Sequence, residues 1–154
     1  MFCVTTRRLP PLLRRAWFSL NQAFRQRLAP LGITPDQFTV LRWLSEAGCQ
    51  GLTQTEITER MASDPNTITA TVRRMELARL LERVPHESDG RSKRVLVLPS
   101  GREVFSEAHS LALALQGRVL ECLSEAEAET FLMLLERVAE ACSEASSSGA
   151  RKKD

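Results

Sequence analysis

The residues best suited to specific chemistry are cations gathered at a short turn. Between two apolar runs, 80–85 and 95–98, lies the segment Asp89-Gly90-Arg91-Ser92-Lys93-Arg94. Asp-Gly is a strong turn signal, because glycine adopts positive φ without steric cost. The segment therefore predicts a β-hairpin tip on which three cations lie within four residues.

A tip of this kind suits a polyanion. Arg91 could enter a narrow minor groove, where the negative potential of DNA is concentrated. Asp89 is placed to brace the Arg91 guanidinium by a charge-assisted hydrogen bond, and Lys93 and Arg94 suit phosphates. A merely solubilising turn would explain the charges but not their position in the chain.

That position is directly after two predicted helices, over 54–62 and 65–79. The turn at 63–65 is too short for antiparallel helices, so it favours the steep crossing of a helix-turn-helix. In the second helix three apolar residues face the core, and the outward residues are short and polar at first and cationic further on. This face suits a major groove, although an amphipathic helix with a solvated face is the alternative. The outward residues are Asn66, Thr67, Thr69, Ala70, Arg73 and Arg74.

The elements that position these residues are mainly helices with legible starts. Capping boxes, in which a Ser or Thr cap is followed three residues later by Glu or Gln, occur at Thr34/Gln37, Thr53/Glu56, Ser100/Glu103 and Ser124/Glu127. Asp64-Pro65 adds a fifth start. Apolar periodicity then predicts further helices over 10–29, 35–47, 101–122 and 125–143. The fold class expected is mainly α with a small β-wing, in a single domain over 1–154 with a disordered tail at 144–154.

Charge is distributed unevenly along the chain. The net charge of +2 does not by itself indicate a polyanionic partner. Residues 1–35 hold six arginines and no acid, residues 73–94 seven cations against four acids, and residues 101–154 six cations against ten acids. This clustering fits one edge that faces a polyanion and an acidic far end, with solvated helix faces as the alternative.

Several classes of function find no support. Arginines interrupt any secretory leader, no stretch is apolar enough to span a bilayer, and a cytoplasmic protein with free thiols is expected. Cys3, Cys49, Cys122 and Cys142, with His86 and His109, show no metal-ligand spacing. No nucleophile–base pair or phosphate loop is present, so neither an enzyme nor a cofactor is expected.

In its ordered set of motifs the chain resembles the MarR family of bacterial transcription regulators, over about residues 10–143. The motifs are Gly32-Ile33-Thr34-Pro35-Asp36-Gln37-Phe38-Thr39-Val40-Leu41, Leu52-Thr53-Gln54, Thr67-Ile68-Thr69, Val72-Arg73-Arg74-Met75-Glu76, the spacing Asp89-x-Arg91-x-x-x-Val95 ending at Gly101, and Leu123-Ser124-Glu125-Ala126-Glu127. The resemblance implies a winged helix-turn-helix at 34–98, with dimerisation helices at 10–29 and 101–143. It also implies a homodimer on a pseudo-palindromic operator of double-stranded DNA.

The chain departs from the family at three places. Arg79 stands where glycine usually ends the recognition helix, at a cost on the order of 1 kcal/mol if φ is positive. The wing ends in Val97-Leu98 in place of Leu-Thr, which leaves capping to Ser100. Ala70 stands where some relatives have a basic side chain that reads bases, so the DNA sequence recognised is open.

The resemblance further implies a repressor released by a small molecule, often aromatic. Five residues are candidates for its pocket, although a packing role explains each of them as well: Trp17, Phe24, Phe38, Trp43 and His109. Control by thiol oxidation is the second route that the resemblance offers, and in the peroxide-sensing branch of the family a cysteine on the first helix pairs with tyrosines. This chain has no tyrosine, and Cys3 precedes the first helix. A winged helix that binds another protein in place of DNA is the rival class of function.

Overall fold

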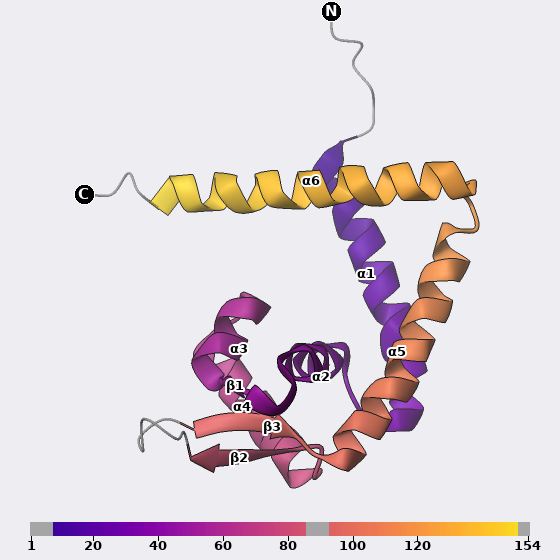
Figure 1. The fold of residues 1–154 in the computed structure, drawn as a ribbon. Coiled ribbons are helices and arrows are strands. Elements are labelled where there is room, and N and C mark those ends of the chain that lie inside the picture. Colours follow the sequence, from indigo (N-terminus) through magenta and orange to yellow (C-terminus); the bar gives the residue numbers. More distant parts are fainter. Residues whose placement is uncertain (1–7, 86–92, 151–154) are drawn as a thin grey trace, which may run out of the picture. The chain divides into compact units, whose positions relative to one another are not determined.

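The computed structural model describes residues 8–85 and 93–150. Helices dominate and a three-stranded sheet completes the fold (Figure 1). The order of elements is α1 (Leu9–Leu28), η1 (Ala29–Leu31), α2 (Pro35–Ala47), η2 (Gly48–Gln50), β1 (Leu52–Thr53), α3 (Gln54–Met61), α4 (Pro65–Leu77), β2 (Leu81–Pro85), β3 (Lys93–Val97), α5 (Pro99–Leu120) and α6 (Glu125–Ala150). The predicted fold class, mainly α with a small β-wing, is confirmed.

Three of the four predicted capping boxes start helices as expected. Thr34 accepts from Gln37 N at 3.2 Å, and Thr53 accepts from Glu56 N at 3.2 Å. Ser124 does the same for Glu127 N at 3.4 Å. The glutamate carboxylates in turn accept from the backbone N–H of the capping residue. The hydrogen bond from the Thr53 backbone N–H lowers the pKa of the Glu56 carboxyl. These pairs satisfy backbone donors that a helix start leaves without a partner.

The fourth box, at Ser100 and Glu103, is wrong. Helix α5 begins at Pro99, whose fixed φ suits the first helical position. Ser100 lies inside the first turn, and its Oγ donates to the Arg79 carbonyl at 2.6 Å. The hydroxyl therefore joins α5 to the end of α4 instead of capping a helix.

The sheet is antiparallel, with the strands in the order β1-β3-β2. The hairpin strands pair from Leu81 opposite Val97 to Pro85 opposite Lys93. The third strand, β1, was not predicted: it is two residues long, and Leu52 and Thr53 lie opposite Val95 and Arg94. A strand this short has no alternation that a sequence pattern could reveal.

One apolar core supports the helix-turn-helix and the sheet. Ile68, Val72 and Met75 of α4 are fully buried, as predicted. They join buried residues from the neighbouring elements, which include Leu28, Phe38, Val40, Leu41, Leu44, Leu52, Ile57, Leu81 and Val95. Burial of this amount of apolar surface is the main favourable term that holds the lobe together.

Helices α3 and α4 both end in a left-handed turn without glycine. Arg79 has φ +57° and Ala62 has φ +47°. After α4, Arg79 N donates to the Glu76 carbonyl at 3.0 Å and Leu80 N to the Met75 carbonyl at 3.0 Å. This is the Schellman pattern, so the corner keeps the geometry that usually calls for glycine, with arginine in its place.

Leu80 is the meeting point of α4, β3 and α5. Its carbonyl accepts from Leu98 N at 3.0 Å. Gly101 lies so close that a Cβ atom there would be 2.0 Å from the same oxygen and 2.9 Å from Val97 Cγ1. Glycine is therefore required at position 101 by space and not by φ.

Helix α1 leaves most of its apolar residues exposed, and α6 differs from prediction in length. Of the apolar residues spaced three or four apart on α1, Leu28 is buried and Phe24 is half-buried, while Leu13, Trp17 and Leu20 are exposed. Helix α6 continues to Ala150, beyond the predicted end at 143. Serine hydroxyls within a helix commonly bond to carbonyls of the preceding turn, and the Ser146 Oγ donates to the Ser143 carbonyl at 2.7 Å.

Contacts divide the chain into two compact units, with the boundary between Leu113 and Ala114. The first unit contains the helix-turn-helix and the sheet. The second contains the end of α5 and all of α6. Within the described residues no helix is both long enough and apolar enough to cross a membrane.

We expect Arg79→Gly to stabilise the protein by up to about 1 kcal/mol, because glycine removes the steric cost of positive φ. Part of that gain is offset by the larger conformational entropy of glycine in the unfolded chain. Urea unfolding should show a higher midpoint at an unchanged slope. Arg79→Ala is the control: it keeps Cβ and should give no gain, so equal stabilisation by both variants would contradict the strain at Arg79.

We expect Gly101→Ala to destabilise the protein by about 3 kcal/mol, because the new methyl group would overlap the Leu80 carbonyl. Gly117→Ala in the same helix is the matched control. A Cβ at Gly117 meets no atom within 4 Å, so alanine there should be neutral or stabilise by up to about 1 kcal/mol. Thermal unfolding of the two variants distinguishes a local clash from a general effect of alanine in α5.

Candidate nucleic-acid interface

Helix α4 presents the polar face that the sequence predicted. All six residues of that face are exposed: Asn66, Thr67, Thr69, Ala70, Arg73 and Arg74. Between them Ile68 and Val72 are buried, and Thr71 is the one buried polar residue on this helix. The alternation of exposed and buried positions fixes which side of α4 a ligand can meet.

Asp64 caps the N-terminus of α4. Asp64 Oδ1 accepts from Thr67 N at 2.9 Å, and Asp64 Oδ2 accepts from the Thr67 hydroxyl. The hydroxyl bond, followed by the backbone bonds, lowers the pKa of the Asp64 carboxyl. The hydroxyl of Thr67 is therefore engaged within the protein.

A series of hydrogen-bonded side chains connects the middle of α4 to α3 and β2. Gln54 Nε2 donates to Thr69 Oγ1 at 3.0 Å, and Gln54 Oε1 accepts from Arg83 Nη1 at 3.3 Å. Arg83 Nε in turn donates to Glu76 Oε2 at 3.0 Å, and this bond lowers the pKa of the Glu76 carboxyl. Each group fixes the next, so the exposed face of α4 is held against the first residue of α3 and the wing.

The predicted wing cations differ in their surroundings. Lys93 is exposed at the end of β3. Arg94 is half-buried, and its Nη1 donates to the Gln50 and Gly51 carbonyls at 2.7 and 3.3 Å. Arg94 thus braces the segment before β1 with one of its nitrogens. Asp89 and Arg91 lie outside the described residues.

Two residues of this surface were missed by sequence reasoning. Gln54 was taken only as the start of α3, although its amide spans to Thr69. Leu77, near the end of α4, is 76% exposed and lies on the stripe of Ala70 and Arg73. The spacing of four and seven residues could have revealed Leu77, whereas no local pattern points to the contact of Gln54.

Three of the five residues proposed for an effector pocket come together. Phe24 and Phe38 meet edge to face with ring centroids 5.1 Å apart, and Phe105, which was not predicted, stacks on Phe38 at 5.6 Å. His109 is exposed, with its ring 5.7 Å from Phe105. The row runs across α1, α2 and α5 and ends at the surface.

The two tryptophans have other surroundings. Trp17 is 67% exposed on α1. Trp43 is half-buried, and the guanidinium carbons of Arg42 and Arg60 lie 5.5 and 5.4 Å from its ring, within cation–π range. Its buried Nε1 has no hydrogen-bond partner among the residues that the structure describes. The rings in contact with Phe24, Phe38 and His109 within the described residues do not include either tryptophan.

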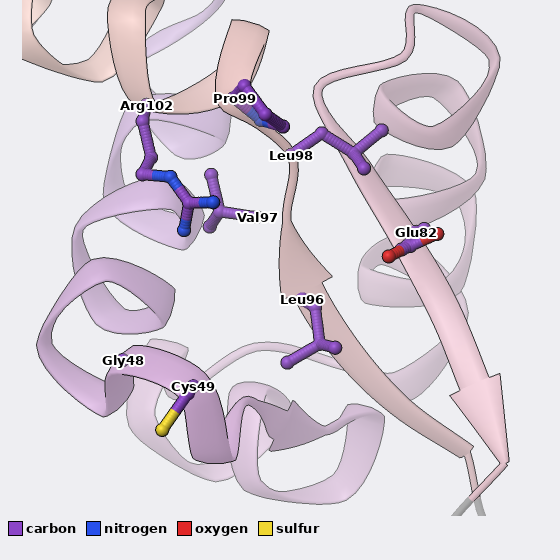
Figure 2. A pocket seen from close by; sticks show the side chains of 8 residues that line it. All are labelled: Gly48, Cys49, Glu82, Leu96, Val97, Leu98, Pro99 and Arg102. Atoms are coloured by element: carbon purple, nitrogen blue, oxygen red, sulfur yellow. The ribbon is translucent and has the colours of Figure 1, made fainter.

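The hollows described on the surface are lined by other residues. One of about 260 Å³ lies beside the root of the wing, with Arg102 of α5 and Cys49 of η2 at its margins (Figure 2). Its walls also include Leu96, Leu98 and Pro99. A smaller hollow, of about 140 Å³, lies between α3 and α4 and is lined by Thr67, Thr71 and Met61 among others.

Cysteine and histidine form no centre in the described part of the chain. Cys49, Cys122 and Cys142 are free and exposed, and no group of three or more metal-ligating side chains is found there. Cys3 and His86 lie outside the described residues. A role for oxidation of these thiols stays a prediction without further support.

Comparisons with known proteins agree with this geometry. A model of the MarR family matches residues 31–92. The HTH-type transcriptional repressor Rv2887 of Mycobacterium tuberculosis is 29% identical over 127 residues, which are 82% of this chain and 90% of the repressor.

Solved structures extend the agreement to the fold. A mutant of MarR from E. coli, crystallised with operator DNA, superposes with a TM-score of 0.76 at 26% identity and covers 83% of this chain and 91% of its own. The MepR–DNA complex of S. aureus gives a TM-score of 0.80 at 24% identity, over 88% of this chain and 98% of its own, which supports the fold alone. With its capped helix pair, its antiparallel wing and these relatives, the chain matches the MarR family of winged helix-turn-helix transcription regulators in fold and in the sequence of its helix-turn-helix.

Proposed function

We propose that the protein is a sequence-specific repressor that binds double-stranded operator DNA as a homodimer. The observation that carries the proposal is the exposed face of α4, which is polar or cationic over about two and a half turns and is held by the hydrogen bonds from Arg83 to Gln54 and from Gln54 to Thr69. A rigid face of this composition matches the hydrogen-bonding edges of bases in a major groove. The relatives named as repressors, and the MarR complex with operator DNA, support the same function.

Each part of the surface has a distinct task in this proposal. Asn66, Arg73 and Arg74 read base edges from α4, because amide and guanidinium groups pair with purines. Lys93 holds a phosphate beside the hairpin, and Arg91 enters the minor groove with Asp89 as its brace. Arg94 contributes charge near the backbone while it supports the segment before β1.

Homodimerisation is supported by apolar surface on the terminal helices. Helix α1 exposes Leu9, Trp17 and Phe18, and α6 exposes Phe131 and Leu134. Large apolar side chains that gather on an exposed helix face are typical of interaction sites. Closed twofold pairing is the commonest way to bury such a face, and it would bring two reading helices to a pseudo-palindrome.

Release by a small aromatic effector completes the proposal. The row Phe24–Phe38–Phe105 ends at the exposed His109, and an aromatic acid or phenol could extend the row by stacking. Trp17 and Trp43 remain candidates that do not contact the row. Neither of the two surface hollows is lined by these residues.

Removing either reading arginine should weaken binding to an operator selected from a random duplex library. We expect Arg73→Ala and Arg91→Ala each to cost about 1–3 kcal/mol, with relaxed preference at the affected base pair. Lys93→Ala should weaken all duplexes alike and reduce the slope of log affinity against log salt by about one. Fluorescence anisotropy across a salt series measures both quantities.

Arg118→Ala is the matched control, because it removes the same exposed charge from α5 and should leave the affinity for the operator as it is. Unchanged affinity in Arg73→Ala and Arg91→Ala would contradict the assignment of the surface. A chain that stays dimeric but binds no duplex at all would instead favour a module that docks another protein.

Light scattering should give a mass of about twice the 17.3 kDa chain at micromolar concentration. We expect the double change Phe131→Glu and Leu135→Glu to shift the protein to monomer, because carboxylates buried without a partner are costly in an interface. Leu77→Glu places the same charge on another exposed leucine, on α4, and should leave the mass at twice the chain. A monomeric wild-type protein would refute the homodimer.

A further inference from the structure

We propose that α4 recognises thymine by its 5-methyl group, through the methyl groups of Thr69 and Ala70. The inference rests on the proposed DNA binding and names what the middle of the reading face selects. It follows from the hydrogen bonds that the hydroxyls of Thr67 and Thr69 already make within the protein.

Thr69 has little hydrogen-bonding capacity left for a base. A threonine hydroxyl has one proton to donate and two lone pairs. Thr69 Oγ1 donates its proton to the Pro65 carbonyl at 2.8 Å and accepts from Gln54 Nε2 at 3.0 Å. Thr69 is nevertheless exposed, so the part of the side chain that remains for a ligand is chiefly its methyl group.

Gln54 makes this arrangement durable. Its Nε2 bonds to Thr69, while its Oε1 is held by Arg83 Nη1 at 3.3 Å. The amide therefore cannot exchange its two ends without losing both contacts. Gln54 is a positioning residue that keeps the Thr69 hydroxyl turned into the protein.

The proton of the Thr67 hydroxyl is also engaged, because this hydroxyl donates to Asp64 Oδ2 in the helix cap. Neither exposed threonine can therefore donate to the acceptors of a purine or to thymine O4. The donors that remain on this face belong to Asn66, Arg73 and Arg74. Arg74 has already used Nε on the Ala70 carbonyl at 3.3 Å.

Ala70 adds a second methyl group next to Thr69, between the donors of Asn66 and Arg73 on the same stripe. In the major groove the one apolar feature among the four bases is the methyl of thymine, and alanine and the threonine methyl are its usual contacts. Donors at both ends and methyl groups between them thus predict a half-site whose central contacts are to thymines.

The test compares duplexes that differ by one methyl group. In the selected operator each thymidine is replaced in turn by deoxyuridine, and anisotropy gives the ratio of the two affinities for each position. One buried methyl corresponds to about a fourfold change in affinity. We expect that ratio for the wild-type protein at one or two thymidines in each half-site.

Two nearly isosteric variants identify the group responsible. Thr69→Ser keeps the hydroxyl and removes the methyl, so at one of those thymidines the ratio should fall from about four to about one. Thr69→Val keeps the methyl and removes the hydroxyl, so the ratio there should stay near four whatever the overall affinity. Ala70→Gly should abolish the ratio at a different thymidine. Each ratio is internal to one variant, so a loss of folded protein cancels.

Thr130→Ser is the control, because Thr130 on α6 makes the same bond to the carbonyl four residues before it, at 2.8 Å, and should keep the wild-type ratios. The proposal is overturned if no replacement by deoxyuridine weakens the wild-type complex. It is also overturned if Thr69→Ser keeps every ratio, since the Thr69 methyl group would then make no contact with a thymine methyl group. Failure of the proposed function has a separate signature, which is absence of binding to any duplex.

Discussion

The close approach of the Leu80 carbonyl to Leu98 and Gly101 is the constraint on which the rest of the reading lobe depends. This one oxygen accepts the Leu98 N–H and lies against a residue that has no room for Cβ. Because Leu80 follows α4 and Leu98 precedes α5, the contact sets where the hairpin leaves one helix and enters the next. The left-handed turn at Arg79 is tolerated since the Schellman bonds and the Ser100 hydroxyl hold it on both sides. Backbone strain at one position is thus compensated by packing at another.

A hydrogen-bonded frame transmits this constraint to the surface that faces DNA in the proposed function. Glu76 and Arg83 lie on either side of the corner and are joined by an ion pair, and Gln54 extends it to Thr69. The frame is only half-buried, so its net contribution to stability is modest. Its effect is on orientation: it decides which atoms of an exposed threonine are available and which are already bonded.

Much of the fold could be predicted because helix starts depend on nearby residues. Thr34, Thr53, Asp64 and Ser124 each have their capping partner three residues away, and local pairs of this kind are readable in sequence. The capping box predicted at Ser100 was wrong because the Ser100 hydroxyl donates to the carbonyl of Arg79, which is distant in sequence. For the same reason the contacts of Arg94, Gln54 and the two-residue strand β1 could not be predicted. The six polar and small residues on the exposed face of α4 were predicted, although Leu77 was not. Only part of the set of aromatic candidates comes together, because periodicity gives a residue's side of a helix but not its neighbours across the core.

Thr53 belongs to two elements at once. Its backbone pairs with Arg94 in the central strand of the sheet, and its side chain begins α3. The base of the wing and the start of α3 therefore share one residue, so that displacing one from the other would break both the strand pair and the helix cap. An event that kept both contacts while it dissociated such a lobe from its ligand would move the lobe as a whole. For a twofold protein the regulated quantity would then be the spacing and angle between two unchanged lobes, and not the shape of either.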